Sequence, residues 1–265
     1  IKPAVNSAGC VFLIAFIENG CCKGVLIMKR WNKKSVLDKL QEISQKGFLS
    51  IPEGMYRNDD GIVGQILERE FGINENNLHI ADLGQYELKG MRKRKSGTLT
   101  LFHQTSTAGM TPIQIFERFS YIRTSRRDGT IKRKLFTTIY GNKENSLGFI
   151  LRASSSYNVD LYYHDEYLAT WDLSSGIEKI QKVLLAFAET QGARNTREEK
   201  FHFVSAYILS SPKNIYEAIS TGAVVMDLCI DQPVDGSKPI HDRGPHIRIP
   251  IKKLDTLFSL VEKVL

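Results

Sequence analysis

Strand-forming and helix-forming segments follow one another in mixed order along this 265-residue chain, and this mixture constrains the fold most. Val11–Ile17 and Val25–Met28 are apolar, β-rich runs on either side of the turn dipeptide Asn19–Gly20, which predicts a hairpin. Residues Ser35–Gly47 place apolar side chains at helical spacing and predict a helix that Ser35 caps. Because the chain mixes both element types and shows no internal repeat, we expect an α/β or α+β protein.

The other predicted elements continue this mixture. Thr98–His103 alternates polar and apolar side chains, as a strand with one exposed face does. A second helix follows Asn58-Asp59-Asp60, which offers helix-capping side chains. We predict further strands at Phe149–Leu151, Val159–Tyr163, Tyr167–Trp171, Phe201–Leu209 and Val224–Ile230, and helices at Gly61–Phe71, Ile177–Glu189, Ile215–Ser220 and Ile251–Leu265.

The composition favours a globular protein with a polyanionic partner. The chain is 42% hydrophobic and carries a formal net charge of +7, with basic residues gathered at Arg92–Lys95, Arg126–Arg127 and Lys132–Lys134. The longest apolar runs are too short to cross a bilayer, so we expect no membrane partner. The four cysteines show no metal-binding spacing, which predicts free thiols in a reducing cytoplasm; they are Cys10, Cys21, Cys22 and Cys229.

The segment Asp82-Leu-Gly-Gln-Tyr-Glu87-Leu-Lys89 carries a chemical signal. In a strand, Glu87 and Lys89 share one face and Leu88 points the other way, while Asp82 at the preceding turn converges on Glu87. Two convergent carboxylates suit Mg²⁺, which binds through one or two carboxylates plus a substrate phosphate. Lys89 adds a charge for that phosphate, or an amine that orients or deprotonates the attacking water. The pattern indicates metal-assisted phosphodiester hydrolysis.

Spacing alone does not decide this function, because the pattern recurs by chance in a chain with 25% charged residues. An exposed edge strand with an incidental ion pair also explains it, and on spacing alone we favour that interpretation. Two acids near the end of the second predicted helix, Glu68 and Glu70, are candidates to face the same site. A helical wheel does not choose between them, although for Glu70 we prefer a solvated charge at the helix end.

A second polar cluster lies at Lys238–Arg248, where a loop enters a predicted strand. His246 and Arg248 share one face of that strand. Arginine forks match guanine O6 and N7 in the major groove of DNA, and histidine or aspartate reads other base edges. The cluster indicates either a base-reading loop or a solvated turn, and its residues alone do not choose between the two.

Taken together, four motifs resemble the MvaI/BcnI family of monomeric type II restriction endonucleases, relatives of the mismatch-repair nickase MutH. They are Gly61-Ile-Val-Gly-Gln-Ile-Leu-Glu68, Ala81-Asp82 with Glu87-Leu-Lys89, Thr98-Leu-Thr-Leu-Phe-His103, and His241-Asp-Arg-Gly with Ile-Arg248-Ile. The resemblance runs from about Ser35 to Leu265. It implies a PD-(D/E)xK fold, a mixed sheet flanked by helices, with a catalytic lobe at about 35–140 and a recognition lobe at about 141–265. Residues 1–34 lie outside it, as a hairpin extension or the end of an upstream region.

The resemblance implies roles for single residues. Asp82 and Glu87 would hold the metal ion, Lys89 would orient the attacking water, and Glu68 would be the helix glutamate that supports the site. The implied cofactor is Mg²⁺, and the implied partner is double-stranded DNA, bound by a monomer that cuts one strand at a time at a CC-x-GG-like target. The residues expected to contact DNA are Arg92, Lys93, Arg94, Lys95, His103, Asp227, His241, Asp242, Arg243, His246 and Arg248. The resemblance also implies that the protein works in a prokaryotic cytoplasm. A companion DNA methyltransferase is expected in the same system, without stable contact with this protein.

The sequence departs from the family pattern at two positions. Ala81 replaces the proline expected before the aspartate, which is harmless if Asp82 keeps its place. Cys229, on the predicted strand of Asp227, stands where we expect a base-reading arginine. A thiol cannot form the bidentate contact to guanine, which is worth about 1–3 kcal/mol of discrimination against the wrong base. The base that this position of the protein would read is therefore not determined by the resemblance.

Three other functions are compatible with these residues. A MutH-like repair nickase would need a partner protein for activation, which a test of the purified protein alone would reveal. The second alternative is a DNA-binding effector module that has lost catalysis, and the presence of Asp82, Glu87 and Lys89 argues against it. A basic protein unrelated to nucleic acid is the third, and it would fail to bind duplex DNA at any salt concentration.

Overall fold

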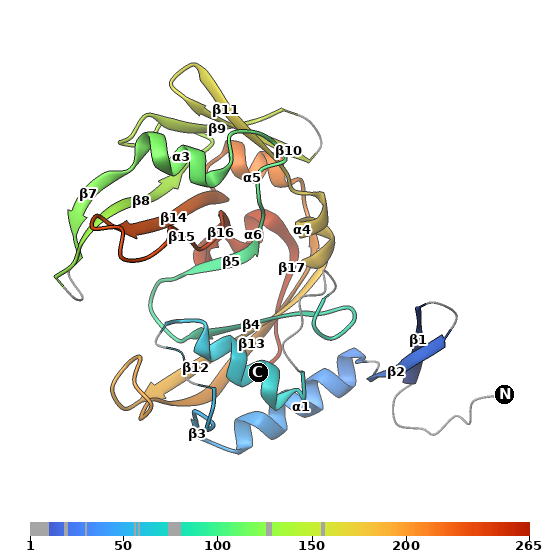
Figure 1. The fold of residues 1–265 in the computed structure, drawn as a ribbon. Coiled ribbons are helices and arrows are strands. Elements are labelled where there is room, and N and C mark those ends of the chain that lie inside the picture. The colour runs from blue at the N-terminus through green and yellow to red at the C-terminus, as the bar shows by residue number, and fades with distance from the viewer. Residues whose placement is uncertain are drawn as a thin grey trace. The chain divides into compact units, whose positions relative to one another are not determined.

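The computed structural model describes residues 11–18, 21–29, 31–55, 57, 59–73, 81–125, 129–154 and 157–265, with side chains from Trp31 onward. The predicted turn at 19–20, the cap candidate Asn58 and the basic pair at 126–127 lie outside these residues. Figure 1 shows the order of the elements. At the N-terminus, β1 (Val11–Glu18) and β2 (Cys21–Lys29) pair in antiparallel fashion, as predicted.

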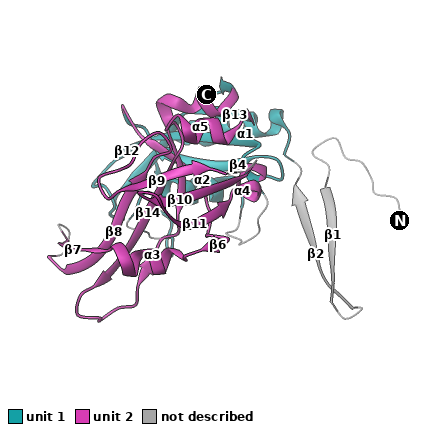
Figure 2. Cartoon of the chain, turned by 90° about the horizontal axis from the view of Figure 1, so that it is seen from above, with its two compact units in different colours: residues 1–94, 179–210, 260–265 teal, residues 95–178, 211–259 magenta. Residues whose placement is uncertain are grey.

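The chain divides into two compact units, coloured separately in Figure 2. Unit 1 consists of residues 1–94, 179–210 and 260–265, and unit 2 of residues 95–178 and 211–259. Each unit is therefore assembled from segments that are distant in the sequence. The contiguous lobes expected at about 35–140 and 141–265 do not coincide with these units, because strands that pair in one sheet come from both halves of the chain.

A mixed sheet forms the centre of unit 1, with strand order β17-β13-β12-β4 and β3 beside β13. β12 and β4 run parallel, with Val183 opposite Glu87 and Leu185 opposite Lys89, whereas β12 and β13 are antiparallel. This is the mixed sheet that the family resemblance implies. The strands are β3 (Leu49–Ser50), β4 (Glu87–Arg92), β12 (Lys182–Gln191), β13 (Lys200–Pro212) and β17 (Phe258–Lys263).

Helices α1 (Lys33–Gln45) and α2 (Ile62–Glu70) pack against this sheet through their apolar faces. In a capping box at the start of α1, Asn32 is the cap and Ser35 the third helical residue, so the predicted cap was placed three residues too late. Leu88 of β4 belongs to the core that both helices bury. Successive strand residues alternate between faces, so Glu87 and Lys89 lie on the opposite face from Leu88, as predicted.

The described residues of unit 2 form two β-sheets. One has the order β5-β16-β14-β8-β7 with β15 beside β14, and the other the order β6-β11-β10-β9. The first comprises β5 (Thr98–His103), β7 (Tyr121–Thr124), β8 (Ile131–Ile139), β14 (Val225–Pro233), β15 (His241–Asp242) and β16 (His246–Pro250). The second comprises β6 (Ala108–Gly109), β9 (Phe149–Ala153), β10 (Asn158–Tyr163) and β11 (Glu166–Asp172), which confirms the predicted meander. The helices that begin in this unit are α3 (Pro112–Phe119), α4 (Ser174–Lys179), α5 (Ile215–Ser220), a 3₁₀ turn (Ile251–Lys253) and α6 (Leu254–Leu257).

Two predicted helices are wrong. Residues 177–189 form the end of α4 and most of β12, where Val183–Ala188 are all buried. A strand buried on both faces loses the alternation of polar and apolar side chains, so its pattern resembles that of a buried helix. Residues 251–265 form the 3₁₀ turn, α6 and β17 instead of one capping helix. No sequence pattern had indicated α3, β7 and β8. None of the helices that the structure describes is long and apolar enough to cross a membrane.

Candidate active site

A tight turn at residues 81–86 brings Asp82 back beside the start of β4. The N–H of Leu83 donates to the carbonyl of Tyr86 at 2.9 Å. Gly84, with φ of +76°, adopts a conformation that glycine reaches without strain, and its N–H donates to the carbonyl of Ala81 at 3.0 Å. Oδ2 of Asp82 accepts a 2.8 Å hydrogen bond from the N–H of Leu88. Asp82 is thus anchored beside the start of β4 with alanine, not proline, before it.

Glu87 is a buried charge on the first residue of β4. Its side chain is 4% exposed, and Nζ of Lys89 donates to its Oε1 at 2.8 Å. Its Oε2 is buried and accepts no hydrogen bond in the described residues, although Nζ of Lys179 lies 3.4 Å away. Burial raises the pKa of the Glu87 carboxyl; Lys89 opposes this increase and the negative charge of Asp82 adds to it. Glu87 is therefore a buried carboxylate whose negative charge is only partly compensated by the described residues.

The pair Asp82 and Glu87 fits a divalent cation. Mg²⁺ needs few protein ligands, because it keeps several waters and takes oxygen from a substrate phosphate. Over the ranges that the structure describes, no three His, Cys, Asp or Glu side chains gather closely enough to hold a metal ion by themselves. A cation at this place would therefore depend on the two carboxylates and on the bound substrate. The buried, unbonded Oε2 of Glu87 is the feature of the chain that such an ion would satisfy.

Helix α2 approaches β4 closely at Gly90. A β-carbon at Gly90 would lie 2.7 Å from the carbonyl oxygen of Val63 and 2.9 Å from the nitrogen of Gly64, distances that real β-carbons do not show. Glycine is therefore required where the helix crosses the strand that carries Glu87 and Lys89. This contact sets the position of α2, and with it that of Glu68, relative to β4.

Glu68 lines a pocket of about 450 Å³ together with Gln65 and Arg69 of the same helix. Asp82, Glu87 and Lys89 are not among the described residues that line this pocket. The supporting role that the resemblance implies for Glu68 therefore stays a prediction. Glu70, preferred as a solvated charge at the helix end, forms an ion pair with Lys46 at 2.7 Å and is partly exposed.

One face of the large sheet in unit 2 brings together residues from three strands. His103 of β5 lies opposite His246 of β16, with their ring centroids 4.4 Å apart, and His246 lies opposite Asp227 of β14. Arg248 of β16 forms an ion pair with Asp227. The alternate residues on the other face, such as Ile247, belong to the buried core. We call the surface made by His103, His246, Arg248, Asp227 and their neighbours on the same side the polar face of unit 2.

Two atoms of the Asp227–Arg248 pair lack hydrogen-bond partners. Oδ1 of Asp227 and Nε of Arg248 are buried and unbonded in the part of the chain that the structure describes. A buried polar atom without a partner is costly, so this acceptor and this donor of one ion pair are suited to a ligand that offers both kinds of group. The edge of a DNA base pair in the major groove presents such groups.

Comparison with known proteins identifies the family of the chain. The model of the MvaI/BcnI restriction endonuclease family matches residues 37–258. The chain belongs to this family. Comparison with curated proteins gave no match.

Solved structures of one restriction endonuclease are similar to the chain. The complex of MvaI with its cognate DNA substrate has a TM-score of 0.71 and 18% sequence identity, over 89% of this chain and 100% of that chain. The structure of MvaI in the absence of DNA has a TM-score of 0.46 and 19% sequence identity, over 90% of this chain and 100% of that chain. The first match supports the restriction-endonuclease-like fold. As an MvaI/BcnI family member, the chain is a type II site-specific deoxyribonuclease, a class that acts on DNA and uses a divalent metal ion.

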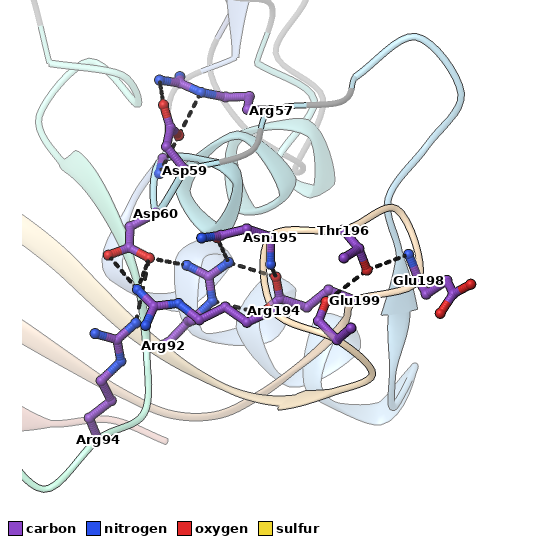
Figure 3. Close-up of polar contacts among 12 residues, drawn as sticks. Arg57, Asp59, Asp60, Arg92, Arg94, Arg194, Asn195, Thr196, Glu198 and Glu199 are labelled. Carbon is purple, nitrogen blue, oxygen red and sulfur yellow. Dashed lines mark hydrogen bonds and ion pairs between the residues drawn. The ribbon is translucent and has the colours of Figure 1, made fainter. Parts of the chain in front are cut away.

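Arg92 does not fit the DNA-contact role expected for it in this MvaI/BcnI family member. Its guanidinium donates to both carboxylate oxygens of Glu199 at 2.7 Å, and its side chain is 5% exposed. It also bonds Asp60 and, at 3.1 Å, Asn195 (Figure 3). With four of its five N–H groups bonded and its side chain buried, Arg92 holds the end of β4 and is not placed to contact DNA.

The basic residues after Arg92 are exposed. Lys93 pairs with Glu189 at 2.7 Å, and Arg94 lies 3.5 Å from Asp60, where Arg194 also binds (Figure 3). Lys95 follows them at the surface. Long basic side chains in such positions are free to exchange weak surface pairs for phosphates, so their expected DNA contacts remain predictions.

The loop residues predicted to read DNA lie beside the polar face of unit 2. Arg243 pairs with Asp231 at 2.9 Å and donates to the carbonyl of Cys229 at 3.3 Å. Asp242 accepts a hydrogen bond from the N–H of Gly244 at 2.8 Å, and His241 is exposed. The structure thus brings this loop and the strand of Asp227 together, while the contacts of these residues with DNA stay predicted.

The structure adds Lys179 to the candidate active site, a residue that no sequence pattern indicated. It is the last residue of α4, just before the chain enters β12, whose Val183 lies opposite Glu87. This parallel register brings the Lys179 ammonium to Oε2 of Glu87. The assignment of 177–189 to a helix removed the register that would have indicated this contact.

Proposed function

We propose that the chain is a Mg²⁺-dependent endonuclease that cuts duplex DNA at a short CC-x-GG-like target, one strand at a time. It acts as a monomer through a single site made of Asp82, Glu87 and Lys89, and leaves 5′-phosphate and 3′-hydroxyl ends. The observation that supports this most directly is the buried, unbonded Oε2 of Glu87 beside a second carboxylate and a lysine. Such a group suits a cation and a phosphodiester better than it suits an incidental surface ion pair.

Bound at the two carboxylates, Mg²⁺ would lower the pKa of a water molecule and offset charge on the scissile phosphate. The residues of the chain do the positioning. The N–H of Leu88 holds Asp82 in place, and the burial of Glu87 limits the competition of water for its oxygens. Lys89, 2.8 Å from Glu87, carries an ammonium that would orient the attacking water and contact the phosphate. Glu68 would support this arrangement from α2.

DNA recognition is assigned to the polar face of unit 2 and to the loop that carries Arg243. Asp227 and Arg248 would pair with base edges, while Lys93, Arg94 and Lys95 would hold phosphates, so affinity should fall steeply with salt. A companion DNA methyltransferase, without stable contact, would protect the host genome, and both enzymes would work in a prokaryotic cytoplasm.

Cleavage of supercoiled plasmid by the purified protein tests this proposal. With Mg²⁺ the wild type should produce nicked circles first and linear DNA later, because a single site cuts the strands in turn. Asp82→Ala should remain folded but leave the plasmid intact, whereas Glu42→Gln, which alters an exposed pair with Lys39 on α1, should cut like the wild type. Cleavage by a folded Asp82→Ala protein would contradict the site assignment.

The same experiment separates the proposal from its rivals. A MutH-like nickase would stay inactive, or stop at nicked circles, until a partner protein was added. A non-catalytic DNA-binding module would bind duplex DNA and metal without producing any nicks. Mapping of the ends on DNA of known sequence would then define the target and the cut position.

A further inference from the structure

Phe136 is an exposed aromatic side chain on the polar face of unit 2. It lies on β8 and is 42% exposed. Its partner across the ladder is Cys229 of β14, the residue that stands where the family pattern predicts an arginine. Directly opposite residues of an antiparallel pair have β-carbons about 4.5–5.5 Å apart, so the phenyl ring and the thiol form one patch. We call Phe136 and Cys229 the apolar patch.

The apolar patch lies on the same side of the sheet as the predicted base-reading residues. Cys229 follows Asp227 by two residues on β14, and strand residues two apart share a face. Leu228, between them, is fully buried on the other side. The patch is thus the continuation, along β14, of the surface on which Asp227 pairs with Arg248.

Cations surround the ring. Nζ of Lys134 lies 5.5 Å, and Cζ of Arg243 5.2 Å, from the centroid of the Phe136 ring. Arg243 is held there by Asp231 at 2.9 Å and by the carbonyl of Cys229 at 3.3 Å. An apolar group between fixed positive charges suits a surface that approaches a polyanion, because the charges attract the partner while the ring contacts an apolar part of it.

The thiol of Cys229 is a neutral, weakly polar group. Burial raises its pKa above the ordinary value for cysteine, and the negative charge of Asp227 adds to this increase. The neutral thiol therefore packs like a small apolar side chain and forms only weak hydrogen bonds. The replacement of an arginine by cysteine exchanges a guanine-reading fork for a surface that fits a methyl group.

In the major groove, the C5-methyl group of thymine is the apolar feature of the base edges, and phenylalanine is one of the side chains that contact it. 5-Methylcytosine carries the same methyl group at the same ring position. We propose that Phe136 and Cys229 select a pyrimidine that carries a C5-methyl group within the DNA target. This inference rests on the proposed function, because it assumes that the polar face of unit 2 contacts the major groove.

Binding to base-modified duplexes tests the proposal. The full chain is titrated, without Mg²⁺, against duplexes of its mapped target in which each thymine in turn is replaced by deoxyuridine and each cytosine by 5-methylcytosine. If thymine is read, one deoxyuridine substitution should weaken binding about fourfold, the factor that corresponds to one buried methyl group. If 5-methylcytosine is read, one methylation should strengthen binding by a similar factor.

Matched variants assign the effect to the patch. Phe136→Ala and Cys229→Ser should bind methylated and unmethylated duplexes equally well. Ile131→Ala removes an exposed apolar side chain from the opposite face of the same strand and should keep the discrimination. Cys229→Ser is nearly isosteric, so it serves as the test if Phe136→Ala fails to fold.

Three results would overturn the proposal. Equal binding of wild type to every methylated and unmethylated duplex removes its basis, and so does discrimination that persists in both patch variants. Failure of the wild type to bind or cut any duplex would remove the proposed function itself, and this inference with it. The first two results would leave the proposed function in place.

Discussion

The carboxylate of Glu199 holds the guanidinium of Arg92 through two hydrogen bonds of 2.7 Å, with side chains that are 1% and 5% exposed. The pair joins the end of β4, the strand of Glu87 and Lys89, to the segment that leads into β13 (Figure 3). Asp60, just before α2, binds the same arginine. A buried charge pair therefore fixes the strand that carries two of the proposed catalytic residues.

Loss of Glu199 should destabilise the protein strongly. Glu199→Ala leaves Arg92 buried without its main partner, which costs about 3–5 kcal/mol of unfolding free energy. Urea denaturation measures this difference. Glu189→Ala, which breaks the exposed pair with Lys93, should cost no more than about 1 kcal/mol, and equal effects of the two variants would show that the burial of Arg92 is not what matters.

Removal of Lys179 should strengthen binding of a divalent cation. The ammonium of Lys179 lies 3.4 Å from the Glu87 oxygen that we assign to the metal, so the two positive charges compete for one ligand. In Lys179→Met, the affinity for Mg²⁺ or Mn²⁺, measured by calorimetry on the protein alone, should rise about fivefold, the equivalent of a partly exposed ion pair of about 1 kcal/mol. Lys182→Met, which removes a bond to Gln85 instead, should bind the ion like the wild type. A lower affinity in Lys179→Met would mean that the lysine supports the metal site.

Alanine should have opposite effects at the two glycines where α2 meets β4. Gly90→Ala would place a β-carbon 2.7 Å from the Val63 carbonyl, so α2 must shift, at a cost of about 1–3 kcal/mol of unfolding free energy and with reduced cleavage. Gly64→Ala would meet only Oε1 of Glu68 at 3.8 Å. Because alanine favours a helix over glycine by about 1 kcal/mol, this variant should be equally or more stable in the same thermal or urea melts. Equal destabilisation of the two variants would contradict the close approach at Gly90.

Base-reading and phosphate-binding residues should differ in how their loss affects DNA affinity. Arg248→Ala should weaken binding to the mapped target by about 1–3 kcal/mol and relax specificity at one base pair. Lys95→Ala should weaken binding to all sequences alike and lower the slope of log affinity against log salt by about 0.9. Anisotropy titrations of target and scrambled duplexes over a range of salt concentrations separate the two effects. A uniform loss for Arg248→Ala would place it among the phosphate contacts.

Local signals predicted the catalytic strand well. The alternation of Glu87, Leu88 and Lys89 depends only on the two-residue period of a strand, and the structure buries Leu88 with the helices while Lys89 pairs with Glu87 on the other face. The turn at Gly84 follows from a residue that tolerates positive φ. The supporting role of Glu68 depends on tertiary placement, and for that reason it was assigned by resemblance and remains to be tested.

The prediction failed where burial on both faces or long-range pairing controls the structure. β12 is buried on both faces at Val183–Ala188, so both faces are apolar and the period that identifies a strand is lost. The mistake hid Lys179, whose contact with Glu87 requires the parallel register of β12 and β4. Arg92 was expected to contact DNA at the surface. Its partner Glu199 lies more than a hundred residues later in the chain, and no sequence pattern indicates that the two residues pair.

By itself, the sequence determined the chemistry that the chain can offer: the two carboxylates and lysine around β4, the order of the family motifs, and a cysteine at an expected arginine position. Only the tertiary structure decided which of these groups act together. Strand pairing placed Phe136 opposite Cys229 and His246 opposite Asp227, and it buried Arg92 away from the basic residues beside it. The reason is physical, because side-chain types are local properties of the chain, whereas register, burial and charge pairing arise only when distant strands form one sheet.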